Sequence, residues 1–576
     1  MAKKKLTNQQ IADVLQEVAL FLEAENVPFK PRAYETAVQT ILQQADDLSA
    51  MYKECGTKCI DDLPGIGESI AEKIEELVKT GKLAYYDRLK KKYPVDMLTL
   101  TRIHDVGPKT VIELYKKLKI KTVRDLERAA KTGKIHELPG FGKKSEENIL
   151  QGIGFLKEDK GRRLLHEVLP IAEAFAERLK KVSGVTHCDV TGSIRRRQET
   201  IGDLDMIIST SKPALAKKAF KEFPEAKKVL QEGGDLVMIQ LQNGMHADLL
   251  ILPPKNYGAG LHHFTGNREH NIELRTWAKK RGITISEEGI YKGKKRIAGQ
   301  TEESIFKVLD MQFIPPELRI GGDEIELARK KKIPKLIEYG SLKGDLQVQT
   351  NWTDGSASIE DMVKAAREHG LEYIAITDHT KSLAMTGGLD EKKLLKQGKE
   401  IDALNKKLKG FRVLKSTECD ILKDGRLDLK DEALKTLDVV SASIHSFFNL
   451  PENEQTERLI RAMKHPLVNI IFHPTGRKVL RRKPYALDMS RILRAAKQYK
   501  VAMEVNGSDR LDLRDIHIRE AVKTGVKLVI NSDAHAPGEF DRLDYGISQA
   551  RRGWAEAKDV LNTKTVNAFL KAIQKS

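Results

Sequence analysis

Residues 202–208, GDLDMII, place two aspartates at the start of an apolar run. Successive side chains of a β-strand point to opposite faces, so Asp203 and Asp205 are expected to share one face. Two carboxylates held so close disfavour each other's ionisation unless a cation lies between them. A third acid, Asp248, stands in MHADLLIL, which is predicted to be a neighbouring strand. The sequence therefore predicts that three acids converge on a pair of divalent metal ions.

The segment TGSIRRRQET, residues 191–200, precedes the aspartates and adds groups that suit a polyphosphate. Gly192 and Ser193 are predicted to form a tight turn, and Arg196 follows it. Phosphoryl transfer needs metal ions to activate a hydroxyl and neutralise the leaving group, together with donors for the phosphates. Solvation of a strand edge would explain either aspartate alone, but not this combination.

A second set of polar residues follows strands in the C-terminal part of the chain. Short apolar runs alternate with helical segments in DLQVQT, YIAITDH, VLKSTE, VVSASIH, NIIFH, VAMEVN and LVINSDAH. This regular order predicts a closed β/α barrel, whose chemistry lies at the carboxyl ends of its strands. Histidines and carboxylates at those ends form a ligand set for Mn²⁺ or Zn²⁺. They are Asp354, His379, Glu418, His445, His473, Asp533 and His535.

Glycine turns recur between short helical segments near the N-terminus. The segments are LPGIGESIAEKI (63–74), HDVGPKTVIELY (104–115) and LPGFGKKSEENIL (138–150). Each predicts a helix-hairpin-helix unit, in which backbone N–H groups at the start of a helix can bind a phosphate. Such contacts position a DNA duplex without reading its sequence. The glycines expected at these contacts are Gly65, Gly67, Gly107, Gly140 and Gly142.

The bulk composition is that of a soluble, multidomain protein. The chain has 576 residues, 40% of them hydrophobic and 32% charged, and a formal charge of +18, which favours a polyanion such as nucleic acid as partner. No apolar run is long enough to span a bilayer, and the basic start MAKKKLTNQQ lacks the apolar stretch of a secretory signal, so a cytoplasmic protein is expected. Four scattered cysteines (Cys55, Cys59, Cys188 and Cys419) predict reduced thiols.

The motif GS-x-x-R…GD-x-D with a later strand aspartate resembles the nucleotidyltransferase palm of family X DNA polymerases. HHFTGNREHNIELR at 262–275 is similar to the thumb motif of that family. The resemblance implies that Asp203, Asp205 and Asp248 hold Mg²⁺ or Mn²⁺, with Asp248 also activating the primer 3′-hydroxyl. Further implied contacts are to the triphosphate (Gly192, Ser193, Arg196, Gly202), the sugar (Phe264, Gly266), the base (Asn271) and the template (Arg275). His263 stands where the family often has an aromatic residue, so selection of the sugar stays open.

Two N-terminal segments, IAEKI (70–74) and RAY (32–34), resemble the lyase domain that removes a deoxyribose phosphate during base excision repair. The resemblance implies Lys73 as the Schiff-base nucleophile, Lys30 as the ligand of the 5′-phosphate and Tyr34 as a positioning residue. The family's usual lysine before IAEKI is replaced by Ser69. A solvated helix residue is the alternative role for Lys73.

The barrel resembles the PHP phosphoesterase domain of bacterial and archaeal family X polymerases, which implies 3′–5′ exonuclease and, in some members, abasic-site or 3′-end processing. The usual His-x-His of the first strand is replaced by Gln347 and Gln349. By analogy with a trinuclear site, one metal would keep only Glu418 and Asp533. The other two would be held by Glu418, His445 and His473, and by Asp354, His379 and His535. A weakened binuclear nuclease and a structural domain both remain open.

Together these features predict a multidomain chain: a helical helix-hairpin-helix region, an α+β nucleotidyltransferase palm and thumb, and a C-terminal (β/α)7 PHP barrel. The expected domains are lyase-like (1–80), fingers-like and DNA-binding (81–150), palm (151–256), thumb (257–318), linker (319–340) and PHP (341–576). The expected function is a monomeric DNA polymerase that fills short gaps from gapped or primer-template DNA and dNTPs. The alternatives are a template-independent nucleotidyltransferase and a DNA-end binding scaffold.

Overall fold

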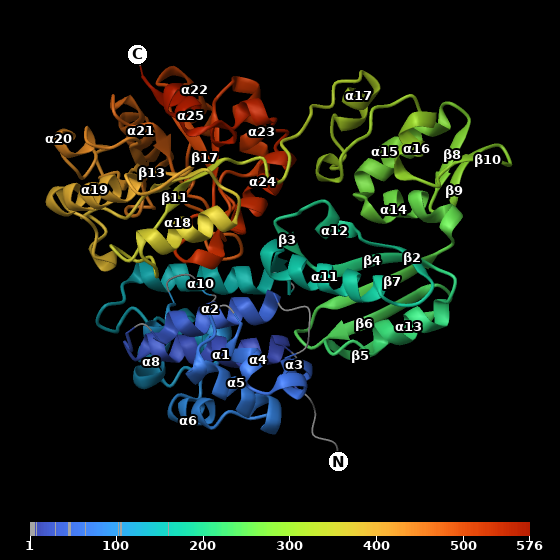
Figure 1. Cartoon of the computed structure of the whole chain (residues 1–576), viewed down its shortest axis with the longest axis horizontal. Helices are drawn as coiled ribbons and strands as arrows, with labels where there is room; N and C mark the ends of the chain where they lie inside the picture. The colour runs from blue at the N-terminus through green and yellow to red at the C-terminus, as the bar shows by residue number, and fades with distance from the viewer. Residues whose placement is uncertain are drawn as a thin grey trace.

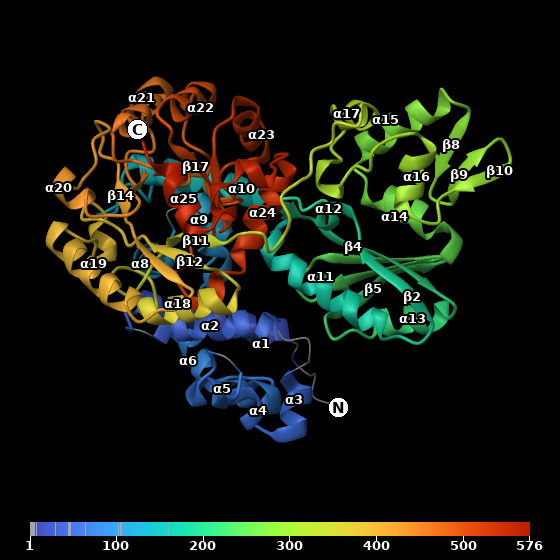
Figure 2. The ribbon, with the colours of Figure 1, turned by 45° about the horizontal axis from the view of Figure 1, so that its top comes forward.

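The computed structural model describes residues 6, 8–28, 30–43, 48–63, 65–101, 103, 106–158 and 161–575. His104, Asp105 and Pro64 of the hairpin segments lie outside the described residues. Figure 1 shows helices at the N-terminal end in blue, a green lobe of sheet and helices, and a yellow-to-red barrel. Figure 2 shows the same arrangement after rotation, with the green lobe joined to the rest on one side.

Short amphipathic helices form the N-terminal region. Their apolar faces, including Leu15, Phe21, Ile74 and Leu114, share one core, as the spacing of apolar residues on these helices requires. The helices are α1 (Asn8–Ala24), α2 (Lys30–Gln43), α3 (Leu48–Cys55), α4 (Lys58–Asp61), α5 (Glu68–Thr80), α6 (Ala84–Lys92), α7 (Met97–Leu100), α8 (Pro108–Leu118), α9 (Val123–Lys131) and α10 (Lys143–Glu158).

A five-stranded sheet in the order β2-β4-β7-β6-β5 follows, and it carries the first set of acids. Strands β4 and β7 are parallel, and their neighbours are antiparallel. Apolar residues alternate along β4 and β7, so one face packs on α11 and the other can carry polar groups. The elements are β1 (Arg163–Leu164), α11 (Leu165–Lys180), β2 (Val185–Val190), α12 (Gly192–Arg195), β3 (Thr200–Ile201), β4 (Asp203–Thr210), α13 (Pro213–Lys221), β5 (Ala226–Gly233), β6 (Leu236–Leu241) and β7 (His246–Leu252).

The next subdomain packs helices and a small antiparallel sheet, in the order β10-β9-β8, around its own core. Its elements are α14 (Tyr257–Thr265), α15 (Arg268–Lys279), β8 (Ile283–Ser286), β9 (Gly289–Lys292), β10 (Lys295–Ala298), α16 (Glu302–Val308) and α17 (Glu324–Arg329). Part of the predicted linker at 319–340 belongs to this core, because Ile325, Ala328 and Ile333 are buried in it. That segment is therefore a folded connection.

Parallel strands form the C-terminal barrel. Two sheets, β11-β12-β13 and β14-β15-β16-β17-β18, are joined by single bridges between His379 and Glu418 and between Val348 and Ala534. The run VLKSTE is split into β13 and β14. The strands are β11 (Gly344–Val348), β12 (Tyr373–Ile376), β13 (Arg412–Lys415), β14 (Glu418–Asp420), β15 (Ser441–Ser443), β16 (Ile470–Ile471), β17 (Ala502–Asn506) and β18 (Leu528–Asn531).

Helices cover the outside of the barrel, as parallel strands require. They are α18 (Ile359–Glu368), α19 (Glu391–Asn405), α20 (Asp431–Leu434), α21 (Glu452–Lys464), α22 (Met489–Gln498), α23 (Asp515–Thr524), α24 (Arg542–Arg552) and α25 (Val566–Ile573). The fold class expected from the sequence, with a helical N-terminal region, an α+β middle and a β/α barrel, is confirmed.

The barrel is attached to the palm sheet region by polar and apolar contacts. Arg477 binds Glu199 through two hydrogen bonds of 3.1 and 2.6 Å, and Gln549 donates to the same carboxylate at 2.6 Å. Beside them, Leu164 of β1 packs with Val479 and Leu511 of the barrel. These contacts join the two parts without leaving the buried carboxylate unpaired.

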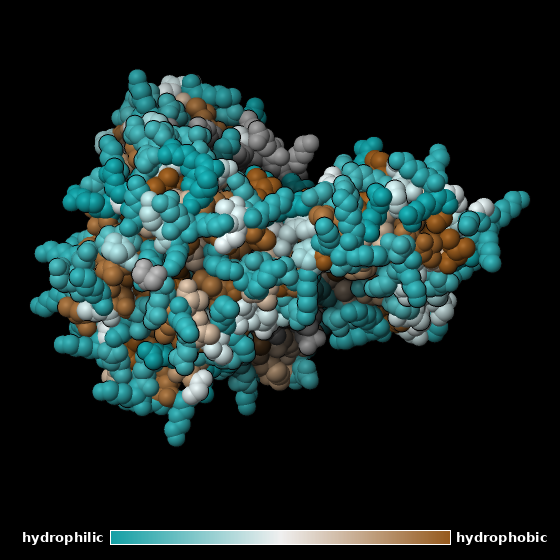
Figure 3. Space-filling view, turned by 90° about the horizontal axis from the view of Figure 1, so that it is seen from above, coloured by the Kyte–Doolittle hydropathy of each residue, from teal (hydrophilic) through white to brown (hydrophobic). Residues whose placement is uncertain are grey.

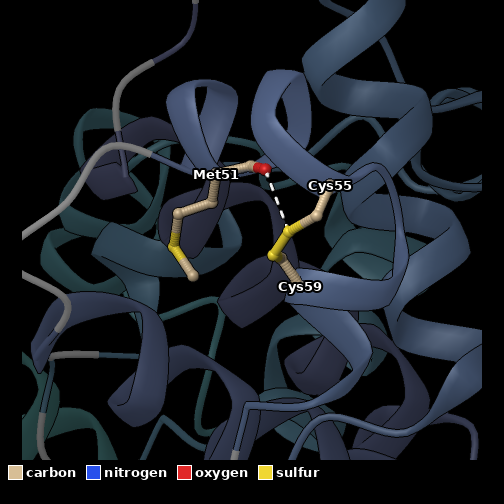
Figure 4. Close-up of a disulfide and its surroundings, with 3 residues drawn as sticks. All are labelled: Met51, Cys55 and Cys59. Carbon is tan, nitrogen blue, oxygen red and sulfur yellow. Dashed lines mark hydrogen bonds between the residues drawn. A yellow bond between two sulfur atoms is a disulfide. The ribbon is translucent and has the colours of Figure 1, made fainter.

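The prediction of reduced thiols is wrong for one pair of cysteines. Cys55 at the end of α3 and Cys59 in α4 form a disulfide, with Cα atoms 5.7 Å apart, and Figure 4 shows the two sulfurs facing each other. A turn at Gly56 between the two helices brings the cysteines to a separation that suits a disulfide, which a count of scattered cysteines does not reveal. Cys188 and Cys419 are free and buried.

The surface is largely polar. Figure 3 shows a face covered mostly by hydrophilic residues, with small apolar groups scattered among them. Within the described part of the chain, no helix has the length and apolarity of a membrane span.

Candidate active sites and nucleic-acid interface

The three predicted acids of the first site meet on one face of the palm sheet. The parallel pairing of β4 with β7 sets Asp205 directly opposite Asp248, and Asp203 lies two residues before Asp205 on the same face. Burial and the charges of Asp203 and Asp248 raise the pKa of Asp205 to about 7. Burial and Asp203 also raise the pKa of Asp248. A divalent cation would remove this repulsion, so the cluster is suited to hold one.

The turn before these acids leaves unsatisfied groups beside them. Gly192 has a φ of +58°, and a Cβ at this position would collide with Oδ2 of Asp205. The Ser193 hydroxyl, the Arg196 Nε and Oδ1 of Asp248 are buried without a hydrogen-bond partner among the described residues. Such atoms are expected to have a ligand in the working protein. Phosphate oxygens suit the two donors, and a metal ion suits the carboxylate oxygen.

A cavity of about 800 Å³ opens between this turn and the α14–α15 subdomain. Its walls hold most of the residues predicted to contact a nucleotide, which are Gly192, Ser193, Arg196, Phe264, Gly266 and Asn271, together with Arg275, which is predicted to contact the template. Asp203 and Asp205 lie at its floor, whereas Asp248 stands just behind them and is not part of the wall. The cavity therefore unites the predicted metal ligands with the predicted nucleotide contacts.

His263 contacts both Asn271, which is predicted to contact the base, and Arg275, which is predicted to contact the template. It accepts a hydrogen bond of 2.8 Å from Asn271 at its carbonyl, and its Nδ1 lies 2.6 Å from Nη2 of Arg275. Burial and the Arg275 charge lower the pKa of His263, so the neutral ring with Nδ1 as acceptor is favoured. The imidazole thus serves as an anchor for Arg275 inside the cavity.

Some residues of the first site were not predicted. Gly202, which was predicted to contact the triphosphate, does not line the larger cavity but a smaller neighbouring hollow of about 370 Å³, whereas Arg162, which was not predicted, lines both spaces. Arg162 stands immediately before β1, and its Nε donates a hydrogen bond of 2.9 Å to the Thr200 hydroxyl of β3. Gln198, Asn267, Arg268 and Ile272 complete the wall of the larger cavity. Gln198 could have been found from the sequence, because it directly follows the arginines at 195–197. Nothing in the sequence around Arg162 indicated a role for that residue.

The barrel gathers its predicted ligands around Glu418. Nε2 of His473 lies 2.7 Å from Oε1 of Glu418, Nε2 of His445 lies 3.1 Å from the same oxygen, and Nδ1 of His379 lies 3.7 Å from Oε2. Although burial favours the neutral acid, His379 and His445 hold the pKa of Glu418 well below its usual value. Glu418 is therefore an anion at the centre of an imidazole cluster.

The metal-ligand groupings differ in one member from those expected. Ligand atoms lie within 4.8 Å of one another in the set His379, Glu418 and His445, and in the set Asp354, His379 and His535. His379 thus belongs to both sets, with one ring nitrogen toward Glu418 and the other 3.5 Å from Asp354. His473, expected with Glu418 and His445, contacts only Glu418 among these atoms. The arrangement suits two adjacent ions that share His379 or Glu418.

The donor atoms of this cluster fit metal ions. Nδ1 of His379, Nε2 of His445 and Nδ1 of His473 are buried and have no hydrogen-bond partner among the described residues. Imidazole nitrogens without a partner, beside an ionised carboxylate, are suited to Mn²⁺ or Zn²⁺. Asp420, which lies 3.2 Å from Nδ1 of His445, orients that ring. Asp420 was missed, although it follows Glu418 by two residues on the same strand face.

Gln347 and Gln349, which stand where the PHP pattern has its first two histidines, turn their side-chain N–H groups toward Glu418. Gln347 and Gln349 both donate to Oε2 of Glu418, at 3.1 and 2.8 Å. Asn506, at the end of β17, donates a hydrogen bond of 3.0 Å to the side-chain Oε1 of Gln347 and one of 3.2 Å to Oδ2 of Asp533. The position of the third metal is thus lined by amide N–H groups. One amide oxygen, Oε1 of Gln349, is buried there without a partner among the described residues, but a neutral amide oxygen is a weak ligand, so the residues present fit a cation poorly.

The glycine turns of the N-terminal region share one geometry. In each, an apolar residue donates its backbone N–H to the residue three positions before it, at 3.0–3.1 Å, in the pairs Ile66–Leu63, Val106–Ile103 and Phe141–Leu138. Gly67 and Gly107 are the N-caps of α5 and α8, and Gly142 directly precedes α10. A Cβ at Gly67, Gly107, Gly140 or Gly142 would meet nothing within 4 Å, whereas one at Gly65 would collide with Thr36. The open turns leave backbone N–H groups accessible to a DNA phosphate.

The three residues predicted for a lyase lie near one another. Burial and the nearby Lys30 lower the pKa of Lys73, although Glu72 opposes the shift. Nζ of Lys73 donates to the carbonyl of Ser69 at 2.7 Å and to its hydroxyl at 2.9 Å. Tyr85, which the sequence did not single out, lies with its ring centre 6.0 Å from that nitrogen, and it contributes with burial to raising the pKa of Tyr34 to about 12.

Family models match four parts of the chain. They describe a helix-hairpin-helix domain at residues 6–83, a SAM-like helix-hairpin-helix tandem at 97–154, a DNA polymerase beta thumb at 260–320 and a PHP domain at 345–508. The order of the matches follows the order of the three structural regions described above.

Known proteins resemble the whole chain and its parts. "DNA polymerase/3′-5′ exonuclease PolX" of Bacillus subtilis (strain 168) is 37% identical over 98% of this chain and 99% of its own length. A probable phosphatase of Thermoanaerobacter sp. (strain X514) is 30% identical over 36% of this chain and 84% of its own length. DNA polymerase lambda of Rattus norvegicus is 23% identical over 54% of this chain and 56% of its own length.

Proposed function

Since the chain belongs to the family X DNA polymerases that carry a PHP domain, we propose that it fills short gaps in DNA and shortens 3′ ends in its barrel. Polymerisation uses the palm, where the oxygen of the primer 3′-hydroxyl attacks the α-phosphate of a bound dNTP, the bond to the β-phosphate breaks and pyrophosphate leaves. The barrel supplies the 3′–5′ exonuclease. The observation that carries the polymerase assignment is the pairing of Asp205 with Asp248 across parallel strands beside the cavity that contains Ser193 and Arg196.

We assign roles in the palm from charge and position. Asp203, Asp205 and Asp248 would hold Mg²⁺ or Mn²⁺, which supplies the positive charge that activates the hydroxyl and neutralises the leaving phosphates. Ser193 and Arg196 are proposed to bind the triphosphate. Phe264 and Gly266 would contact its sugar, Asn271 its base, and Arg275 the template. These roles are supported by the shared cavity and by the buried donors that lack partners.

The partners and setting follow from the same assignments. Gapped or primer-template DNA and dNTPs are the substrates, and the open glycine turns are proposed as the duplex contacts. A monomer acting in the cytoplasm is the proposed working state.

A gapped duplex and an RNA end test this function against the template-independent alternative. With Mg²⁺, the protein should add the dNTP complementary to the template across a one-nucleotide gap and should leave an RNA 3′ end unextended. Asp205→Asn should stop the addition without loss of DNA binding. Asp235→Asn, an exposed acid on the same palm sheet region, is the matched control. Untemplated extension of RNA, or unchanged extension by Asp205→Asn, would contradict the proposal.

For the barrel, we propose a binuclear nuclease rather than an inert domain. His379, His445 and Glu418 with Asp354 and His535 would hold two Mn²⁺ or Zn²⁺ ions, supported by the unpartnered ring nitrogens. His379→Ala should abolish the shortening of a labelled primer in Mn²⁺. The half-buried His465 of the same barrel, changed to Ala, serves as control, because it lies outside the cluster and pairs with Asp431.

A lyase is a second candidate function, favoured by the lowered pKa of Lys73 beside Lys30. An amine with a depressed pKa is neutral more often and can attack the sugar aldehyde. Borohydride should trap wild type on DNA with a 5′-deoxyribose phosphate. Lys73→Ala should lose the cross-link and Lys82→Ala, an exposed lysine, should retain it. Equal trapping of both variants would exclude Lys73 as the nucleophile.

A further inference from the structure

Arg510 points its charge into the part of the barrel site that fits a metal ion poorly. It lies in the loop after β17, and its Nε is 3.6 Å from Oδ2 of Asp533. Asp533 is the acid that the sequence assigned, with Glu418, to the third metal. A cation is therefore already supplied there by the chain itself.

The neighbouring donors disfavour a further cation. Asn506 donates to the same Oδ2 of Asp533, and Gln347 and Gln349 donate to Oε2 of Glu418. An ion placed between these two carboxylates would face amide N–H groups and a guanidinium. Amide hydrogens and a positive charge repel a metal ion, so this side of the site is built for an anion.

The acids around Arg510 leave its guanidinium able to bind a further anion. The adjacent residue Asp509 is also an acid. Asp509 has other partners, Arg481 at 3.6 Å and Lys478 at 3.9 Å. Within the described residues, no hydrogen bond from the Arg510 guanidinium meets normal geometry, and 14% of its side chain is exposed.

We propose that Arg510 binds a phosphate of the DNA end that enters the barrel, in place of the charge of a third metal ion. The inference rests on the proposed nuclease function of the barrel. A guanidinium presents paired N–H groups that match two oxygens of a phosphate, and such charge-assisted hydrogen bonds are strong. The Arg510 side chain lies next to the ligands of the two metal positions, because Asp533 and Glu418 border both Arg510 and those ligands. The barrel site thus consists of two metal positions and a fixed cation.

Binding of thymidine 5′-monophosphate, the product of shortening a strand that ends in thymidine, tests Arg510 without requiring turnover. The full chain carries Asp203→Asn and Asp205→Asn in every sample. Metal bound by the palm acids is therefore not included in the measured Mn²⁺ content. Mn²⁺ content is measured after gel filtration, and nucleotide affinity by calorimetry. Wild-type barrel should hold two Mn²⁺ ions. Arg510→Gln should keep both ions and bind the nucleotide at least about tenfold more weakly, since it loses a charge-assisted contact.

Arg494→Gln is the matched control, because Arg494 is an exposed arginine on α22 of the same barrel. It removes the same net charge and should leave the affinity unchanged. Arg510→Lys should restore part of the binding. Unchanged affinity in Arg510→Gln, or three Mn²⁺ ions in the wild-type barrel, would overturn the proposal. Failure of the nuclease function has a different signature: two ions and Arg510-dependent nucleotide binding, with no shortening of DNA.

Discussion

At the scale of single residues, Gly192 shows how closely the palm site is packed. Its left-handed backbone, with a φ of +58°, brings the turn against the Asp205 carboxylate, and no room remains for a Cβ. The amide of the preceding Thr191 donates 2.8 Å to the carbonyl of Asp205, which fixes the turn to β4. Glycine is therefore required twice, for its conformation and for its lack of a side chain.

Gly192→Ala should abolish nucleotide addition, because the new methyl group must displace the Asp205 carboxylate from its position. Gly293→Ala is a matched control, since Gly293 has the same φ of +58° but open space around its Cβ position. Both variants should lose about 1 kcal/mol of stability from backbone strain. Single-turnover incorporation of one dNTP distinguishes them. Equal rates for the two alanine variants would show that Asp205 need not stay in place.

At the scale of elements, the open glycine turns form a repeated backbone surface. Gly107 and Gly142 have no positive φ and no neighbour within 4 Å of an added Cβ. A methyl group at either position therefore leaves the fold intact but covers the N–H groups at the start of the following helix. Substitution of these glycines by alanine can therefore weaken DNA binding without changing the stability of the fold.

The double variant Gly107→Ala/Gly142→Ala should weaken binding to gapped DNA about tenfold, because two phosphate contacts are blocked, with an unchanged melting temperature. Fluorescence anisotropy at a fixed salt concentration measures the affinity. Gly154→Ala, within α10 and also surrounded by open space, should bind DNA like wild type. If the double variant binds as tightly as Gly154→Ala, these turns do not hold the duplex.

A buried ion-pair network holds the turn helix α12 against the α14–α16 subdomain. Glu302 accepts two hydrogen bonds from Arg195, at 2.9 and 2.7 Å, and one of 2.5 Å from Arg319, which is fully buried. Burial favours the neutral acid, yet Arg319 and Arg195 hold the pKa of Glu302 below its usual value. The pair thus stabilises the fold at pH values above the usual carboxyl pKa, and this contribution is lost as the pH falls toward the depressed value.

Glu302→Gln should lower the free energy of unfolding by about 3–5 kcal/mol at pH 7, since two arginines lose the anion between them. Glu303→Gln changes the adjacent, exposed acid and should have little effect. Urea unfolding at pH 7 compares the two. A loss of stability equal to that of Glu303→Gln would mean that the network contributes nothing.

The strands and their polar ends could be predicted from local patterns, whereas the contacts between distant segments could not. Alternation along 203–208 places Asp203 and Asp205 on one face, and the βα order places the barrel ligands at one edge. The direct pairing of Asp205 with Asp248, the role of Arg162 in the cavity wall and the sharing of His379 between two ligand sets depend on strand order and on segments far apart in sequence. The Cys55–Cys59 disulfide depends on the turn between two short helices.

At the scale of the whole molecule, two candidate sites occupy separate folds that are joined by polar and apolar contacts. Glu199, which follows the arginines of the palm turn, is held by Arg477, four residues after His473 of the barrel. Each site nevertheless has its own ligands and its own core. Loss of one set of metal ligands is therefore expected to leave the other activity in place.

Primer extension on a gapped duplex, scored for both growth and shortening of the primer, tests this most directly. In Mg²⁺ with Mn²⁺, wild type should produce both longer and shorter products. Asp205→Asn should only shorten the primer, and His379→Ala should only lengthen it. Continued lengthening by Asp205→Asn would contradict the central claim that the palm acids hold the metal ions of DNA synthesis.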